Sequence, residues 1–194
     1  MIEIKDLVNA LTKLPGIGKK SATRLSYFII KNKQIGFELS KVINEVTSGI
    51  RFCNVCGNYT TNETCSICED ITRDNTILCI VEEPNDLAAI EETGFFKGQY
   101  HILMGNINPL EGRTPESLKI NELVKRIEKS NYSEVLIATN PTIEGEATFL
   151  YLSNLLGKYN LKKSRIATGI PMGGSLEYSD TFTLGKALQS KLYI

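Results

Sequence analysis

Four cysteines, arranged as two Cys-x-x-Cys pairs with eight residues between them, constrain this chain more than any other feature. Each pair can present two thiolates on one tight turn, and two such turns complete the tetrahedron that zinc prefers. Since thiolates would fill all four positions, no place remains for a substrate water, and the spacing predicts one structural zinc ion per chain. Four unrelated thiols or a redox Cys-x-x-Cys are the alternatives, which the doubled motif disfavours. The expected ligands are Cys53, Cys56, Cys65 and Cys68.

The composition is that of a globular protein. Of the 194 residues, 42% are hydrophobic, enough for one domain of ordinary size and smaller modules. No apolar run approaches the ~18 residues needed to cross a bilayer, and the N-terminal residues lack the pattern of a signal peptide, so we expect a cytoplasmic protein. The fifth cysteine, Cys79, is interpreted as a core residue, and the single histidine, His101, as a core or edge residue of a strand.

The charges are unevenly distributed although their sum is zero. Residues 1–52 carry nine basic and four acidic side chains, whereas residues 53–164 carry ten basic and sixteen acidic ones. A basic head on an acidic body indicates polyanion binding at one end of the chain, although a solvated basic face would have the same composition.

The basic head has helical periodicity in three stretches, and the first two are joined by the segment Leu-Pro-Gly-Ile-Gly-Lys-Lys-Ser-Ala. Gly16 and Gly18 permit positive φ and close approach of the backbone. The N–H groups of this turn and of the next helix, which is expected to begin at Ser21 or in the loop, can therefore face a phosphate. Lys20 and Arg24 lie four apart on one helix face and can add charge against a DNA backbone. The segment resembles the helix-hairpin-helix motif of DNA-binding proteins. A plain turn with solvated lysines is the alternative.

After the cysteines, short apolar runs alternate with amphipathic stretches. This alternation predicts an α/β fold, with a parallel sheet flanked by helices. We expect buried strands at residues 76–83, 99–104, 134–139 and 165–170, and a last helix at residues 181–192. Changes of pattern divide the chain into a small all-α head (1–52), a zinc knuckle (53–76), a sheet domain (77–170), and a C-terminal loop and helix (171–194).

Acidic side chains follow two of the expected strands. Glu82 ends the first strand, and Glu144 and Glu146 follow the third, at the edge where parallel sheets bind ligands. Both stretches resemble the Toprim domain of topoisomerases and primases, in which a Glu and two aspartates hold Mg²⁺; the two aspartate positions correspond to Asn140 and Thr142. Because neutral side chains bring no charge against Mg²⁺, we expect that this site no longer supports phosphoryl transfer. The glutamates still allow weak metal binding or an acidic docking face.

A glycine-rich segment from Gly169 to Asp180 follows the fourth expected strand. Such a loop suggests nucleotide binding, but it lacks the Gly-Lys-Ser/Thr ending of a phosphate-binding loop. We therefore favour a plain loop or a role in contact between subunits.

The helix-hairpin-helix, the four-cysteine knuckle, the Toprim-like sheet and the segment Gly-Ile-Pro-Met-Gly-Gly-Ser-Leu-Glu-Tyr-Ser-Asp, in this order, resemble the RecR family of bacterial recombination mediators. The resemblance implies a non-enzymatic homo-oligomer, from dimer to tetramer ring, that clamps DNA during repair. It also implies partnership with RecO, and possibly RecF, in loading RecA on gapped single-stranded DNA. On this resemblance Lys20 and Arg24 face DNA, while Glu144 and Glu146 lie on the surface that meets RecO. The alternative is a Mg²⁺-dependent Toprim nuclease or primase-like enzyme that uses Glu82 with the other two glutamates.

Overall fold

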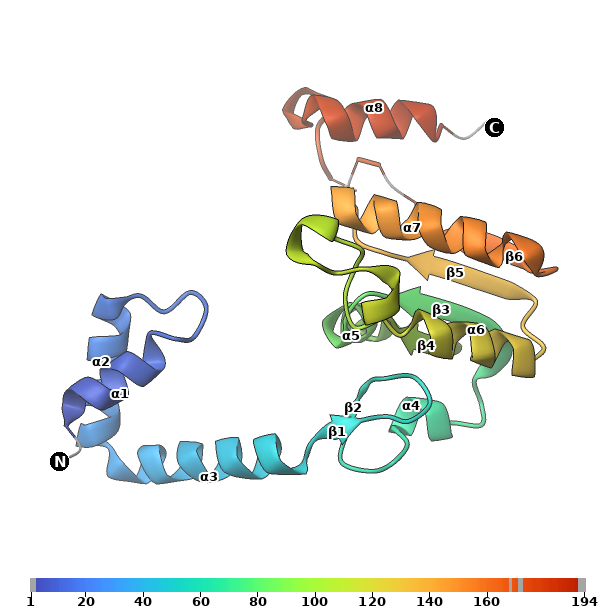
Figure 1. The fold of residues 1–194 in the computed structure, drawn as a ribbon. Helices are drawn as coiled ribbons and strands as arrows, with labels where there is room; N and C mark the ends of the chain where they lie inside the picture. Colours follow the sequence, from blue (N-terminus) through green and yellow to red (C-terminus); the bar gives the residue numbers. More distant parts are fainter. Residues whose placement is uncertain (1–2, 168, 171–172, 192–194) are drawn as a thin grey trace. The chain divides into compact units, whose positions relative to one another are not determined.

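The computed structural model describes residues 3–167, 169–170 and 173–191, which fall into two compact units. The units span Met1–Ile50 and Arg51–Ile194 (Figure 1). The boundary lies just before the expected end of the head, because Arg51 and Phe52 pair with a strand of the knuckle. No helix within the described ranges is long and apolar enough to span a membrane.

The first unit consists of three helices, as the periodicity predicts. α1 and α2 pack against each other, and α2 buries Ala22 and Ser26. Of the two starts expected for α2, Ser21 or the loop, the structure has the loop: the helix begins at Lys19, with Gly18 as its N-cap. Lysine is a good helix former and glycine is an acceptable N-cap, so the helix needs no serine cap. The bounds are α1 Ile4–Leu11, α2 Lys19–Lys31 and α3 Lys33–Gly49.

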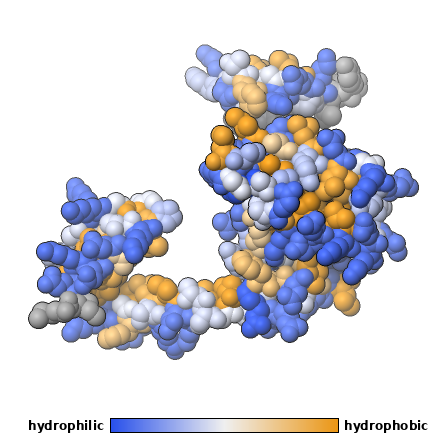
Figure 2. Space-filling model, in the orientation of Figure 1, coloured by the Kyte–Doolittle hydropathy of each residue, from blue (hydrophilic) through white to orange (hydrophobic). Residues whose placement is uncertain are grey.

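Apolar side chains of α3 remain on the surface of this unit. The helix buries none of its residues. Hydrophobic surface is visible on the unit in Figure 2. When the apolar stripe of an amphipathic helix faces solvent, the stripe can pack against the surface of another molecule. The exposed apolar residues of α3 include Phe37, Leu39, Val42, Ile43 and Val46.

The second unit opens with the knuckle, which consists of a two-stranded antiparallel ribbon and one helical turn. The ribbon pairs Arg51 with Thr60 and Phe52 with Tyr59. The elements are β1 Arg51–Phe52, β2 Tyr59–Thr60 and α4 Ser66–Glu69.

A four-stranded sheet in the order β4-β3-β5-β6 forms the body of this unit, and all its pairings are parallel. The predicted α/β class is therefore confirmed. The strands are β3 Asp74–Val81, β4 Gly98–Ile102, β5 Glu134–Ala138 and β6 Lys162–Arg165. The helices are α5 Pro84–Glu92, α6 Ile120–Lys129, α7 Ile143–Leu155 and α8 Thr181–Gln189, and the 3-10 turns are η1 Pro109–Glu111, η2 Pro115–Ser117, η3 Leu156–Lys158 and η4 Leu176–Tyr178.

Side chains of the central strand β3 alternate between two cores. Leu78 and Ile80 pack in the core that includes α6 and α7, whereas Cys79 and Val81 pack in the core that includes α5 (Figure 1). Because successive residues of a strand point to opposite faces, helices on both faces require apolar side chains throughout the buried second half of β3, residues 78–81. Cys79 is fully buried, as predicted for a core residue. His101 is buried in the edge strand β4, and its Nε2 atom lies 2.8 Å from the Lys119 carbonyl oxygen.

The fourth strand was expected at residues 165–170, and this position is wrong. β6 spans Lys162–Arg165 and pairs only with β5, so it is an edge strand whose side chains are mostly exposed. Because the side chains of β6 are mostly exposed, this strand needs no apolar run, which is why the Arg-Ile-Ala-Thr-Gly-Ile pattern misplaced it. Residue 168 of the expected strand and residue 192 of the expected last helix lie outside the described residues.

Candidate metal centre and nucleic-acid interface

The four cysteines of the knuckle converge on one point. Their sulfur atoms all lie within 4.8 Å of one another, and those of Cys56 and Cys65 are 3.6 Å apart. Among the residues that the structure describes, this is the single cluster of three or more potential metal ligands. Four thiolates around one point fit one tetrahedral zinc ion and leave no open position, so the centre is a structural zinc site.

Backbone N–H groups of the knuckle point at two of these sulfur atoms. The Cys53 sulfur accepts from the amides of Val55 at 3.4 Å and Cys65 at 3.3 Å, and the Cys56 sulfur accepts from the Asn58 amide at 3.4 Å. Such donors stabilise thiolates and orient them toward a metal. A hydrogen bond with the Cys68 thiol, more than any other contact, lowers the pKa of Cys56 to about 5, while burial raises the pKa of Cys65 to about 11. Zinc binding must therefore displace protons from this set.

The knuckle is fastened to the outer edge of β4. The Ile102 amide donates to the Cys56 carbonyl at 2.8 Å. The Arg126 guanidinium on α6 donates to the Val55 carbonyl at 3.3 Å and to the Tyr100 carbonyl at 2.5 Å. Gly57, with φ of +87°, packs against Met104 just beyond the strand. One backbone hydrogen bond and the Arg126 side chain therefore join the metal centre to the sheet.

In the head, the glycine hairpin leads directly into α2. Gly16 has φ of +78°, as expected, whereas Gly18 has φ of −78° and occupies the N-cap. The Lys20 and Arg24 side chains are exposed on α2, and neither makes an ion pair within the described part of the chain. No acidic residue occurs in the first turn of α2. The positive end of the helix dipole and two unpaired cations therefore lie beside the hairpin.

At the carboxyl edge of the sheet, Glu82 is buried in a cage of amides. Its Oε1 atom accepts from the Asn140 backbone N–H at 2.8 Å, and its Oε2 atom accepts from the side-chain amides of Asn106 at 2.9 Å and Asn140 at 3.1 Å. The side chain is 2% exposed. Asn140 therefore supplies hydrogen bonds to this glutamate at a position where a Toprim enzyme has a carboxylate. The sequence did not predict the role of Asn106, because no local pattern links an asparagine in a loop to Glu82, which lies 24 residues away in the chain.

The other residues of this edge make contacts with their neighbours. Thr142 caps α7, its Oγ1 atom accepting from the Gly145 amide at 3.0 Å. Glu146 pairs with Arg165 through an Oε2 to Nη2 contact of 3.0 Å. The Arg165 guanidinium holds the pKa of Glu146 below its usual range, and Lys186 adds to this effect. Glu144 is partly exposed in the first turn of α7.

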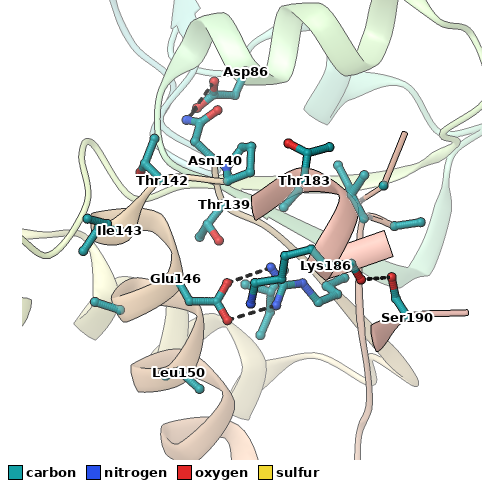
Figure 3. Close-up of a pocket in the computed structure, with 18 of the residues that line it drawn as sticks. Asp86, Thr139, Asn140, Thr142, Ile143, Glu146, Leu150, Thr183, Lys186 and Ser190 are labelled. Carbon is teal, nitrogen blue, oxygen red and sulfur yellow. Dashed lines mark hydrogen bonds and ion pairs between the residues drawn. The ribbon is translucent and has the colours of Figure 1, made fainter. Parts of the chain in front are cut away.

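A groove of about 1190 Å³ adjoins these residues. The end of β5, α7 and α8 line it, with Glu146 on α7 and Lys186 on α8 on either side (Figure 3). Of the glycine-rich segment, Gly173 has φ of +83° and Asp180 caps α8 by accepting from the Thr183 amide at 2.9 Å. Residues 171 and 172 of this segment lie outside the described residues, and its role in subunit contact stays a prediction.

Comparison with known proteins agrees with this domain order. Family models match the chain for the helix-hairpin-helix of RecR (residues 4–47), the four-cysteine zinc finger domain of RecR (50–70), the Toprim domain (76–167) and the C-terminal part of RecR (169–191). The fold and the metal centre therefore define a recombination protein that joins a helix-hairpin-helix, a zinc finger and a Toprim domain.

Relatives of similar length identify the family. Proteins named "Recombination protein RecR" from Tropheryma whipplei (strain Twist), Streptomyces coelicolor and Pelotomaculum thermopropionicum are 43%, 42% and 45% identical to the chain. The alignments cover 98%, 97% and 95% of this chain and 97%, 95% and 93% of the relatives. The chain belongs to the RecR family, which confirms the family predicted from its motifs.

Proposed function

We propose that this protein is a DNA-binding recombination mediator that works by binding and not by catalysis. The hydrogen-bonded cage around Glu82 supports the part of the proposal that excludes catalysis. Both carboxylate oxygens already accept hydrogen bonds from asparagine amides, and among the described residues Glu82 belongs to no cluster of three or more potential metal ligands. Recombination and repair are the roles that membership of the RecR family supports.

DNA binding is assigned to the hairpin of the head, through Gly16, Gly18, Lys20 and Arg24. The hairpin amides and the two unpaired cations suit phosphate oxygens and read no base, so binding is independent of sequence. Changing both Lys20 and Arg24 to alanine is expected to weaken DNA binding and to make the slope of log affinity against log salt shallower by about 2. Titration of labelled DNA by fluorescence anisotropy at several salt concentrations measures both quantities.

A charge-matched control is available in the same head. Lys31→Ala with Lys41→Ala removes two positive charges as well, at the end of α2 and on α3, where Lys41 lies 3.9 Å from Glu45. This control is expected to retain most of the affinity. Equal affinity in the Lys20/Arg24 variant and the unchanged protein, with an unchanged salt slope, would contradict the assignment.

Catalysis is tested directly with Mg²⁺ and gapped DNA. We expect neither cleavage nor strand synthesis, because Glu82 is hydrogen bonded in its cage and Asn140 brings no charge against a cation. Gel analysis of end-labelled gapped DNA makes the measurement. Cleavage or synthesis that Glu82→Gln abolishes would favour the alternative, a Mg²⁺-dependent nuclease or primase-like enzyme.

Assembly and partners form the rest of the proposal. The exposed apolar stripe of α3 supports self-association through the head, since a stripe of this kind is stabilised by burial against a second copy. A homo-oligomer, from dimer to tetramer ring, would then clamp DNA. The acidic surface at Glu144 and Glu146 is assigned to RecO, and cooperation with RecO, and possibly RecF, would help load RecA on gapped single-stranded DNA.

A further inference from the structure

The knuckle carries an exposed pair of stacked aromatic rings. Phe52 and Tyr59 lie directly opposite each other on the β1–β2 ribbon, with ring centroids 5.4 Å apart and planes inclined by 26°. They are 48% and 52% exposed, respectively. Within the described residues Tyr59 makes no other ring contact and its hydroxyl has no hydrogen-bond partner. A stacked pair in solvent has an unused π-face, because neither ring is buried in the core of the unit.

A lysine accompanies this pair. The Nζ atom of Lys119, at the start of α6, lies 5.2 Å from the centroid of the Phe52 ring, within the range of a cation–π contact. Lys119 makes no ion pair among the residues described. Arg51 adjoins Phe52, and residues 51–62 contain no aspartate or glutamate. Along residues 51–62 the side chains are therefore positive or neutral apart from the thiolates of the metal centre, and the first acidic residue is Glu63.

The rings are also held in a fixed position. Cys53, next to Phe52, is a ligand of the zinc centre, and its amide donates to the Asn58 carbonyl, next to Tyr59, at 2.7 Å. Metal ligation and the ribbon thus fix both rings before any ligand arrives. A fixed ring costs less conformational entropy on binding than a mobile one.

We propose that Phe52 and Tyr59 form a stacking platform for an unpaired nucleobase, with Lys119 positioned for the adjoining phosphate. Every base has a π-face, so aromatic rings beside cations bind single strands with little regard to sequence, whereas bases inside a duplex already stack on each other. The exposed residues Asn54 and Asn62 of the knuckle are polar, and Val55 is 43% exposed. Two rings and one valine make a small apolar surface for a protein interface. The inference rests on the proposed DNA binding and adds which part of gapped DNA the knuckle contacts.

The test compares Tyr59→Ala with Tyr59→Phe on a labelled oligothymidylate and on a duplex of equal length. Loss of the ring is expected to weaken single-strand binding roughly five- to hundredfold, which corresponds to ~1–3 kcal/mol for a stacked base, with little change on duplex. Tyr59→Phe, which keeps the ring, is expected to bind as the unchanged protein does. Phe95→Ala removes an aromatic ring that is 92% exposed outside the knuckle and serves as the matched control. Zinc content and circular dichroism establish that each variant is folded.

Photo-crosslinking supplies an independent readout. An oligonucleotide that contains 5-iodouracil is expected to crosslink to the peptide that carries Tyr59, as located by mass spectrometry. Unchanged single-strand affinity in folded Tyr59→Ala would overturn the inference, and a simultaneous change in its mass in solution would assign the rings to a protein interface. These results differ from failure of the proposed function, in which the unchanged protein binds neither oligonucleotide.

Discussion

Serine in place of Cys53 or Cys65 is expected to release the zinc and unfold the knuckle. The cluster of buried residues in the knuckle consists of cysteines, with Ile67 and Cys68 packed against it, so apolar burial alone is small. Structural zinc supplies roughly 10–16 kcal/mol to modules of this kind, and three ligands hold it far less well than four. Elemental analysis for zinc and thermal denaturation followed by circular dichroism measure the two effects.

Cys79→Ala is the matched control, since it removes a cysteine that lies in the core of the sheet and outside the metal cluster. The variant is expected to keep its zinc, and its free energy of unfolding should fall only by the cost of the small cavity that the missing sulfur atom leaves. A Cys53→Ser or Cys65→Ser protein that melts at the same temperature as the unchanged protein and carries no zinc would contradict the structural role of the metal.

Alanine at Gly145 is expected to destabilise the second unit by about 3 kcal/mol or more, because the change overpacks a rigid site. A Cβ atom there would lie 2.0 Å from the Asn140 carbonyl oxygen and 2.8 Å from Glu82 Oε1. Both neighbours are fixed, the first by the backbone and the second by its amide cage. For a unit of this size the loss lowers the melting temperature by roughly 6–12 °C, which calorimetry can measure.

Gly185→Ala separates this clash from the general effect of adding a methyl group. Gly185 lies in α8, and a Cβ atom there meets no heavy atom within 4 Å. Alanine in a helix interior is favoured over glycine by roughly 0.5–1 kcal/mol, so this variant is expected to melt at the same temperature or slightly higher. If the Gly145→Ala variant has the same melting temperature as the Gly185→Ala variant, the close contact of α7 with Glu82 and Asn140 is not rigid.

Local patterns in the sequence predicted the features that depend on neighbouring residues. Cysteine spacing identifies the metal centre because each pair must share one turn, and the alternation of apolar runs identifies β3, β4 and β5 because they are buried. The start of α2 was left open between Ser21 and the loop, since glycine and serine are both acceptable N-caps. Such boundaries depend on small energies.

Features that depend on distant residues were not predictable in the same way. The cage around Glu82 joins β3 to the loop at Asn106 and to the end of β5 at Asn140, and only the folded sheet brings these residues together. β6 was misplaced because its sequence, Lys-Lys-Ser-Arg, has no apolar signal and its position follows from pairing with β5. The docking of the knuckle on β4 likewise depends on Arg126, which is more than seventy residues from Val55.

The two margins of the sheet differ in how they avoid pairing with foreign strands. Unpaired strand edges are templates for aggregation, and charged side chains such as those of Lys162, Lys163 and Arg165 discourage it on β6. On β4 the protection comes from the knuckle, because the Ile102 amide is bonded to the Cys56 carbonyl. Loss of zinc is therefore expected to uncover the edge of β4, so that this protein becomes less soluble when the cell is short of the metal.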